Sequence, residues 1–298
     1  MFNIDHIDFN DDIYENLIKT KKGTPKKGRG NIFPHYDGLI SHIKWYLKIS
    51  PYFENIKSIY NTKLLVHNEL YNLYDSESKD IKTLKKEIKK KTISDAKTKN
   101  GLVCPYCGIK RNEIHDLDHY MPRSKYPEYS ILSNNLIYVC TTCNQDYKKN
   151  EFLDSSNLRK FLNPYYDSIL DTKEVIRCII TINGNILNIE FKANQLIQTE
   201  SKYLYQVIQN HIDTLDLDNR YNKLIRQDLL DKFFNKFREK SILNQRQIRN
   251  YELDEVYNYI NDKIDELFDS PINNFEILFW KEFIKCKSYF ECIKGQVL

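Results

Sequence analysis

Several features that mark membrane, exported or ATP-driven proteins are missing from this sequence of 298 residues. No apolar run approaches the roughly 20 residues that a membrane span requires. The N-terminal segment MFNIDHIDFNDDIYENL is acidic and mixed, unlike a signal peptide. The ATP-binding pattern GxxxxGKS/T occurs nowhere, so any control by ATP must come from another protein. These absences predict a cytoplasmic protein.

Glycine and alanine are also scarce, whereas isoleucine, asparagine, lysine and tyrosine are abundant. This bias could reflect AT-rich codons, so the number of lysines alone says little about partners. The distribution of charge says more, because residues 1–150 hold 25 lysines and arginines against 18 acidic residues, and the remainder holds 20 against 23. A basic first half favours a surface there for a polyanion such as nucleic acid. A solvated lysine face explains the same charges equally well.

The composition, with 41% hydrophobic and 29% charged residues, is that of a folded protein, and the length allows two or three modules. Apolar residues recur at helical spacing in 36–49, 55–74 and 78–96, and again from about residue 194 onward. Alternating residues around Asn183-Gly184 predict a β-hairpin near 174–192. We therefore expect a basic helical region (1–99), a compact core (100–152) and a C-terminal region of hairpin and helices (153–298).

Four of the seven cysteines form two CxxC pairs, CPYC and CTTC, separated by 32 residues. Each pair can place two thiolates on one tetrahedral ion, so the two pairs together complete a closed zinc site. Such a site is structural, since it leaves no position for water or substrate. An iron-sulfur cluster and four unrelated thiols are the alternatives. The predicted ligands are Cys104, Cys107, Cys140 and Cys143.

The segment between and just beyond the two pairs resembles the HNH nuclease family. Asp118-His119 followed by YMPRS matches the family's DHxxPxS element, and Asn135-Leu136 before CTTC matches its NLxxxCxxC element. Asn144 follows the last cysteine as in the family's CN element. The resemblance covers roughly 50 residues. It implies a ββα-metal unit, with strands around 114–119 and a helix from about 140 to 150, inside a mainly helical α+β chain.

The resemblance also implies the roles of individual residues. Asp118 and Asn144 would ligate a catalytic divalent ion, His119 would act as general base toward water, and Asn135 would orient His119. Elementary chemistry agrees, because carboxylate and amide oxygens are hard ligands suited to Mg²⁺ or Mn²⁺. A neutral histidine can accept a proton near neutral pH.

Basic residues near these motifs are candidates for contact with nucleic acid. Arg123 and Lys125 follow the DH pair, and Lys148 and Lys149 follow Asn144. This lysine pair begins one residue later than the lysine of the CNxxK arrangement in many relatives. Arginine suits phosphate because its donors form a fork, although exposed solvated side chains would read the same way in the sequence.

These observations favour an HNH endonuclease that hydrolyses DNA by a one-metal mechanism. A non-catalytic zinc module that binds nucleic acid or protein is the alternative, and an HNH-type ribonuclease is another. A binding module has no need of the Asp118, His119, Asn135 and Asn144 set. The chain also resembles bacterial anti-phage effectors, some of which pair with a separate ATPase. That resemblance implies a role in defence and a partner ATPase or other regulatory protein, and it leaves oligomerisation open.

Overall fold

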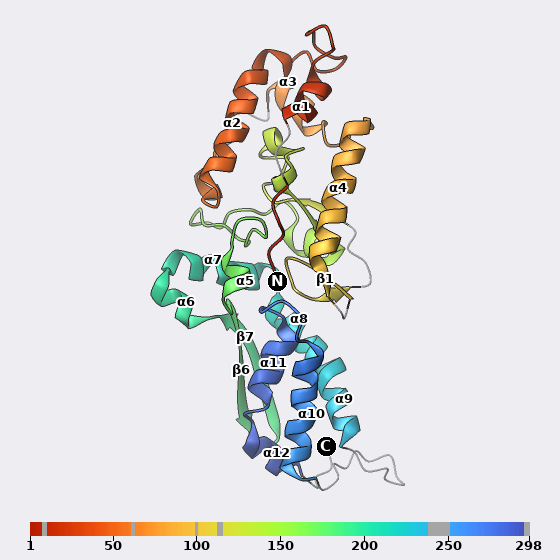
Figure 1. The fold of residues 1–298 in the computed structure, drawn as a ribbon. Coiled ribbons are helices and arrows are strands. Elements are labelled where there is room, and N and C mark those ends of the chain that lie inside the picture. Colours follow the sequence, from red (N-terminus) through yellow and green to blue (C-terminus); the bar gives the residue numbers. More distant parts are fainter. Residues whose placement is uncertain (8–10, 61–62, 99–100, 112–115, 238–250, 295–298) are drawn as a thin grey trace. The chain divides into compact units, whose positions relative to one another are not determined.

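A computed structural model describes residues 1–298 except 8–10, 61–62, 99–100, 112–115, 238–250 and 295–298 (Figure 1). The chain forms two compact units. The core unit comprises Phe2–Lys97 and Gly101–Ser168, and the C-terminal unit comprises Met1, Thr98–Asn100 and Ile169–Leu298. Both combine helices with small antiparallel strand pairs, which confirms the predicted α+β class. Among the described residues, no helix is long and apolar enough to cross a membrane.

Over its described residues, the core unit contains four α-helices and several short elements. The α-helices are α1 (Asp11–Ile18), α2 (Tyr36–Ile49), α3 (Leu65–Tyr71) and α4 (Lys79–Ala96). The 3-10 turns are η1 (Phe33–His35), η2 (Phe53–Asn55), η3 (Pro127–Tyr129) and η4 (Ser133–Asn135). The strands are β2 (Gly101–Val103), β3 (Lys110–Arg111), β4 (Asp116–His119) and β5 (Leu136–Val139), and β1 (Lys97–Thr98) spans the boundary in sequence between the two units.

Two of the three helices predicted before the cysteines are confirmed. Helix α2 has the predicted bounds and buries one apolar face, and α4 begins within one residue of the predicted start. Helix α4 packs on β5 and β2 and buries Ile81, Leu84 and Ile88. Most lysines of its basic run are exposed.

The predicted helix 55–74 is wrong over most of its length, because only α3 forms within it. The buried carboxylate of Glu128 accepts hydrogen bonds from the Ser58 hydroxyl, at 3.0 Å, and from the Ile59 backbone N–H, at 3.2 Å. These contacts hold the segment before α3 away from helical geometry. A tertiary interaction thus overrides a helical periodicity in the sequence.

Strands β4 and β5 pair antiparallel, with Asp118 opposite Ile137 and His119 opposite Leu136. The chain then enters a π-helix, η5 (Thr142–Lys148). This order of two strands and one helix is the expected ββα arrangement. The helix is shorter than the predicted 140–150, and the first two residues of the predicted strand 114–119 lie outside the described residues.

The C-terminal unit is built on the predicted hairpin. Strands β6 (Ile176–Asn183) and β7 (Ile186–Ala193) pair along their whole length around Gly184, whose positive φ of 61° suits a tight turn. Helix α11 packs on β6, whereas α7 and α8 pack on β7. The helices are α5 (Ile169–Thr172), α6 (Gln195–Glu200), α7 (Lys202–Thr214), α8 (Leu217–Leu224), the π-helix η6 (Ile225–Leu230), α9 (Asp231–Lys236), α10 (Leu253–Glu266), α11 (Phe275–Phe283) and α12 (Lys287–Ile293).

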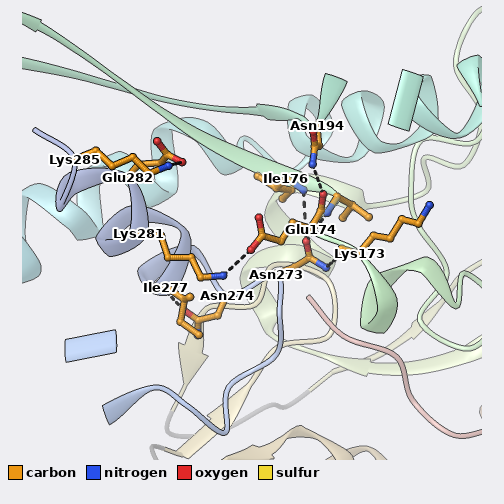
Figure 2. Close-up of polar contacts among 11 residues, drawn as sticks. Lys173, Glu174, Ile176, Asn194, Asn273, Asn274, Ile277, Lys281, Glu282 and Lys285 are labelled. Atoms are coloured by element: carbon orange, nitrogen blue, oxygen red, sulfur yellow. Dashed lines mark hydrogen bonds and ion pairs between the residues drawn. The ribbon is translucent and has the colours of Figure 1, made fainter. Parts of the chain in front are cut away.

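One buried asparagine ties the start of the hairpin to the segment before α11 (Figure 2). The Asn273 side chain is completely buried, and its oxygen accepts from the Val175 N–H at 2.7 Å. Its amide nitrogen donates to the carbonyls of Leu170, at 2.7 Å, and Lys173, at 3.0 Å. The side chain therefore satisfies backbone groups on both sides of residue 174 that are shielded from water.

Replacing Asn273 with alanine is expected to lower the free energy of unfolding of this unit by about 3 kcal/mol, because buried backbone groups lose their partners. Chemical denaturation followed by tryptophan fluorescence measures the change, since Trp280 lies in the same unit. The matched control is Lys281→Ala, which breaks a partly exposed ion pair with Glu174 and should cost less than about 1 kcal/mol. Equal effects would contradict the prediction.

Candidate metal and catalytic sites

The four predicted zinc ligands lie together. The cysteine thiols at 104, 107, 140 and 143 are buried, and their sulfur atoms all lie within 4.8 Å of one another. Cys107 Sγ and Cys140 Sγ are 4.0 Å apart. A tetrahedral zinc with Zn–S bonds of about 2.3 Å requires sulfur atoms about 3.8 Å apart. The cluster therefore fits a structural zinc ion.

The first cysteine pair owes its shape to a tight turn. The Gly108 N–H donates to the Cys104 carbonyl at 2.7 Å, and Gly108 has a φ of 64°, which a residue with a side chain rarely adopts. In the second pair, the Cys140 backbone N–H donates to Cys104 Sγ at 3.4 Å. Cys140 directly follows β5, and Cys143 lies in η5. Zinc bound here would therefore link the end of strand β5 to the helix η5 that follows it.

A pocket of about 220 Å³ opens beside β4. Five of the predicted functional residues line it, namely Asp118, His119, Arg123, Asn144 and Lys149. The remaining lining residues are Tyr71, Leu117, Pro122, Ser124 and Asn150. The pocket thus brings the predicted metal ligands, the predicted general base and two cationic side chains together in one place.

The Asp118 carboxylate is almost completely buried and is held at both oxygens. Tyr106 donates its hydroxyl to Oδ2 at 2.7 Å, and Lys148 Nζ lies 2.9 Å from Oδ1. Each carboxylate oxygen has a further lone pair available. Asp118 and the Asn144 amide are hard oxygen donors, so the donor set fits a Mg²⁺ or Mn²⁺ ion.

Lys148 lies inside the fold. Its side chain is completely buried, and besides Asp118 its amine donates to the His119 carbonyl at 2.8 Å. A direct phosphate contact by Lys148 stays a prediction. The observed contacts favour a different role, in which the amine holds the Asp118 carboxylate in place.

The π-helix accounts for the spacing between Asn144 and Lys148. The Lys149 N–H donates to the Asn144 carbonyl at 2.8 Å, five residues back along the chain. A turn of this kind holds one residue more than an α-helical turn. The wider turn therefore compensates for the extra residue between Asn144 and Lys148, and Lys148 still reaches Asp118.

His119 ends β4 with its ring fixed in one orientation. Its Nε2 lies 2.9 Å from the Ser130 carbonyl, and its ring packs edge-on against Tyr74 at 4.6 Å. Because a carbonyl only accepts hydrogen bonds, Nε2 carries the proton and Nδ1 remains the acceptor. Burial lowers the pKa of His119 to about 3, against the opposing effect of the Ser130 carbonyl. The imidazole is therefore neutral at physiological pH.

The Asn135 side chain contacts backbone groups of the loop near this ring. Its side chain is completely buried, accepts from the Met121 N–H at 2.8 Å and donates to the carbonyls of Met121 and Tyr129, each at 3.1 Å. Ser130, whose carbonyl holds His119, directly follows Tyr129. Asn135 thus holds backbone groups of the loop around His119, and its predicted role in orienting His119 stays a prediction.

The remaining basic candidates differ in position. The Arg123 guanidinium lies 4.2 Å from the Tyr71 ring centroid and pairs with Asp75 at 2.8 Å, at the wall of the pocket. Lys149 is exposed at the pocket and has a φ of 50°, a backbone conformation that costs about 1–3 kcal/mol in residues with a side chain. Lys125 is also exposed, and the pocket lining does not include it.

The structure places three further groups at this site that the predicted site residues do not include. Tyr106, between the first two cysteines, holds Asp118, and the Ser130 carbonyl holds His119. Asp116 receives a hydrogen bond from Asn144 at 3.1 Å. Asp116 could have been found from its position two residues before Asp118 on one strand, since such residues share a face. No sequence signal marks a backbone carbonyl such as that of Ser130.

Comparison with known proteins agrees with this geometry. Residues 104–150 match the family described as HNH endonuclease, so the chain carries an HNH endonuclease domain at the cysteine cluster and the pocket. The chain is also similar to Protein ea31 of Escherichia phage lambda, with 23% identity over 206 residues. That match spans 65% of this chain and 66% of the phage protein, just under two thirds of its length. No solved structure matches the chain.

Proposed function

We propose that the HNH domain hydrolyses phosphodiester bonds of DNA with one divalent ion, Mg²⁺ or Mn²⁺. The observation that supports this most is that Asp118, Asn144 and a neutral His119 line one pocket. Asp118 and Asn144 would hold the ion. A module that only binds nucleic acid would gain nothing from a buried carboxylate beside an unprotonated histidine. Removing these polar side chains from water costs free energy, and binding alone does not require it.

Each residue has a distinct task in the proposed reaction. His119 Nδ1 takes a proton from the attacking water, while the Ser130 carbonyl keeps the ring in the required tautomer. Lys148 and Tyr106 hold the Asp118 carboxylate in place. Arg123 and Lys149, which line the pocket, would contact the phosphate. When bound, the ion supplies counter-charge for the transition state and assists the leaving oxygen.

We assign this activity to cytoplasmic defence of a bacterium against phage or foreign DNA, under control of a separate ATPase or another regulatory partner. The resemblance to anti-phage effectors supports this assignment. It also agrees with the absence of an ATP-binding GxxxxGKS/T pattern from this sequence.

The test is incubation of the purified protein with supercoiled plasmid in Mg²⁺ or Mn²⁺, with EDTA in a parallel sample and structured RNA as a second substrate. Nicked or linear plasmid is expected only when the divalent ion is present. Cleavage of RNA alone would favour the ribonuclease alternative. Inactivity on both substrates, with bound zinc intact and with candidate partners added, would favour the binding module.

A further inference from the structure

Asp116 lies two residues before Asp118 on β4, and its carboxylate binds two side-chain amides of η5. Its Oδ2 accepts from Asn144 Nδ2 at 3.1 Å and from Gln145 Nε2 at 2.8 Å. Asp116 is not among the residues that line the pocket, whereas Asn144 is. The carboxylate therefore reaches the pocket only through its neighbour.

These contacts fix which end of the Asn144 amide faces Asp116. Asp116 Oδ2 accepts both hydrogen bonds, so the NH₂ end of the Asn144 amide faces it. The carbonyl oxygen then points away from Asp116. A rotated amide would present its NH₂ group where a cation needs an oxygen, because the two ends have nearly the same shape and opposite polarity.

We propose that Asp116 is a positioning residue that offers the Asn144 oxygen to the divalent ion. This inference rests on the proposed function, in which Asn144 and Asp118 ligate that ion. Partners that orient a metal ligand in this way typically change metal affinity 10- to 100-fold. An effect of about this size is expected from the loss of Asp116.

The test is a double-mutant cycle on Mn²⁺ binding, measured without nucleic acid by the paramagnetic resonance signal of free Mn²⁺. Asp116→Ala is expected to weaken Mn²⁺ binding about 10- to 100-fold in the natural chain. In the background of Asn144→Asp, the same change should weaken binding less than about threefold. The reason is that a carboxylate offers an oxygen in either orientation, so residue 116 has no amide left to orient.

The two backgrounds separate this role from the alternatives. If Asp116 were itself a metal ligand, or acted only through its charge, Asp116→Ala would weaken binding equally in both, and the inference would be wrong. Absence of Mn²⁺ binding by the unaltered chain would instead contradict the metal site of the proposed function. Gln145→Ala is the matched control, since it removes the other partner of Asp116 and should change affinity less than about threefold.

Zinc content and the thermal unfolding temperature are measured for every variant, because a structural role alone would lower both. Asp116→Asn serves as the second variant. Its carbonyl can still accept from Asn144, but its amide no longer enforces one orientation, so an intermediate loss of affinity is expected. Affinities of Asp116→Asn that match those of Asp116→Ala in both backgrounds would also overturn the inference.

Discussion

Replacing His119 with alanine is expected to lower the rate of metal-dependent DNA cleavage by about 10²- to 10⁴-fold, the usual contribution of a general base. The ring is the proposed proton acceptor in the pocket, and its burial keeps it neutral, with a pKa of about 3. Zinc content should not change, since His119 is not part of the cysteine cluster. Initial rates of plasmid nicking at saturating Mg²⁺ measure the effect.

His67 provides a matched control for this substitution. Its Nε2 lies 3.1 Å from the Ser124 carbonyl. His119 makes a similar contact with the Ser130 carbonyl, and both carbonyls belong to the segment between β4 and β5. His67 is buried but is not among the residues that line the pocket. His67→Ala should therefore lower stability while keeping the cleavage rate within about threefold at a temperature where the variant is folded. Similar losses in the two variants would show that His119 acts through the fold and not as a base.

The features that the sequence predicts well are those encoded by a few neighbouring residues. Two CxxC pairs need only short turns to present their thiols, and Asn183-Gly184 specifies its hairpin locally. Asp118 and His119 belong to the DHxxPxS element, whose resemblance to the HNH family predicts one shared site, and both residues line the pocket. In each case the chemistry and the local backbone agree.

The features that could not be predicted depend on contacts between distant residues. Ser58 and Glu128 are 70 residues apart in the sequence. Their hydrogen bond nevertheless helps to hold the segment before α3 out of the helix that the sequence predicts for residues 55–74. The burial of Lys148 depends on the π-helix η5, and the sequence of residues 142–148 does not predict a π-helix. From the sequence alone, Lys148 is expected at the surface, because lysine is rarely buried without a partner. The structure shows that its partner is Asp118. Recognising the burial of Lys148 and the backbone contacts of Asn135 therefore required the structure.

Removing the zinc ligands is expected to unfold the core around β4, β5 and η5. Binding of a structural zinc contributes about 10–16 kcal/mol in small zinc-dependent folds, which matches or exceeds the total stability of about 5–15 kcal/mol of a typical domain. Cys107→Ser combined with Cys140→Ser should abolish zinc binding. Cleavage should be lost with it, because Tyr106 lies between Cys104 and Cys107 and holds Asp118. Atomic absorption and thermal unfolding followed by circular dichroism measure the two effects.

Cys292→Ser is the control, because it makes the same chemical change in the C-terminal unit, outside the cysteine cluster. It should keep zinc content and cleavage unchanged. Limited proteolysis locates the damage in the double variant, where new cuts are expected between residues 101 and 150 while the hairpin β6–β7 stays protected. A double variant that retains its unfolding temperature and metal-dependent cleavage would show that the cluster is dispensable. The catalytic pocket would then depend on packing by Tyr106 and Lys148 alone.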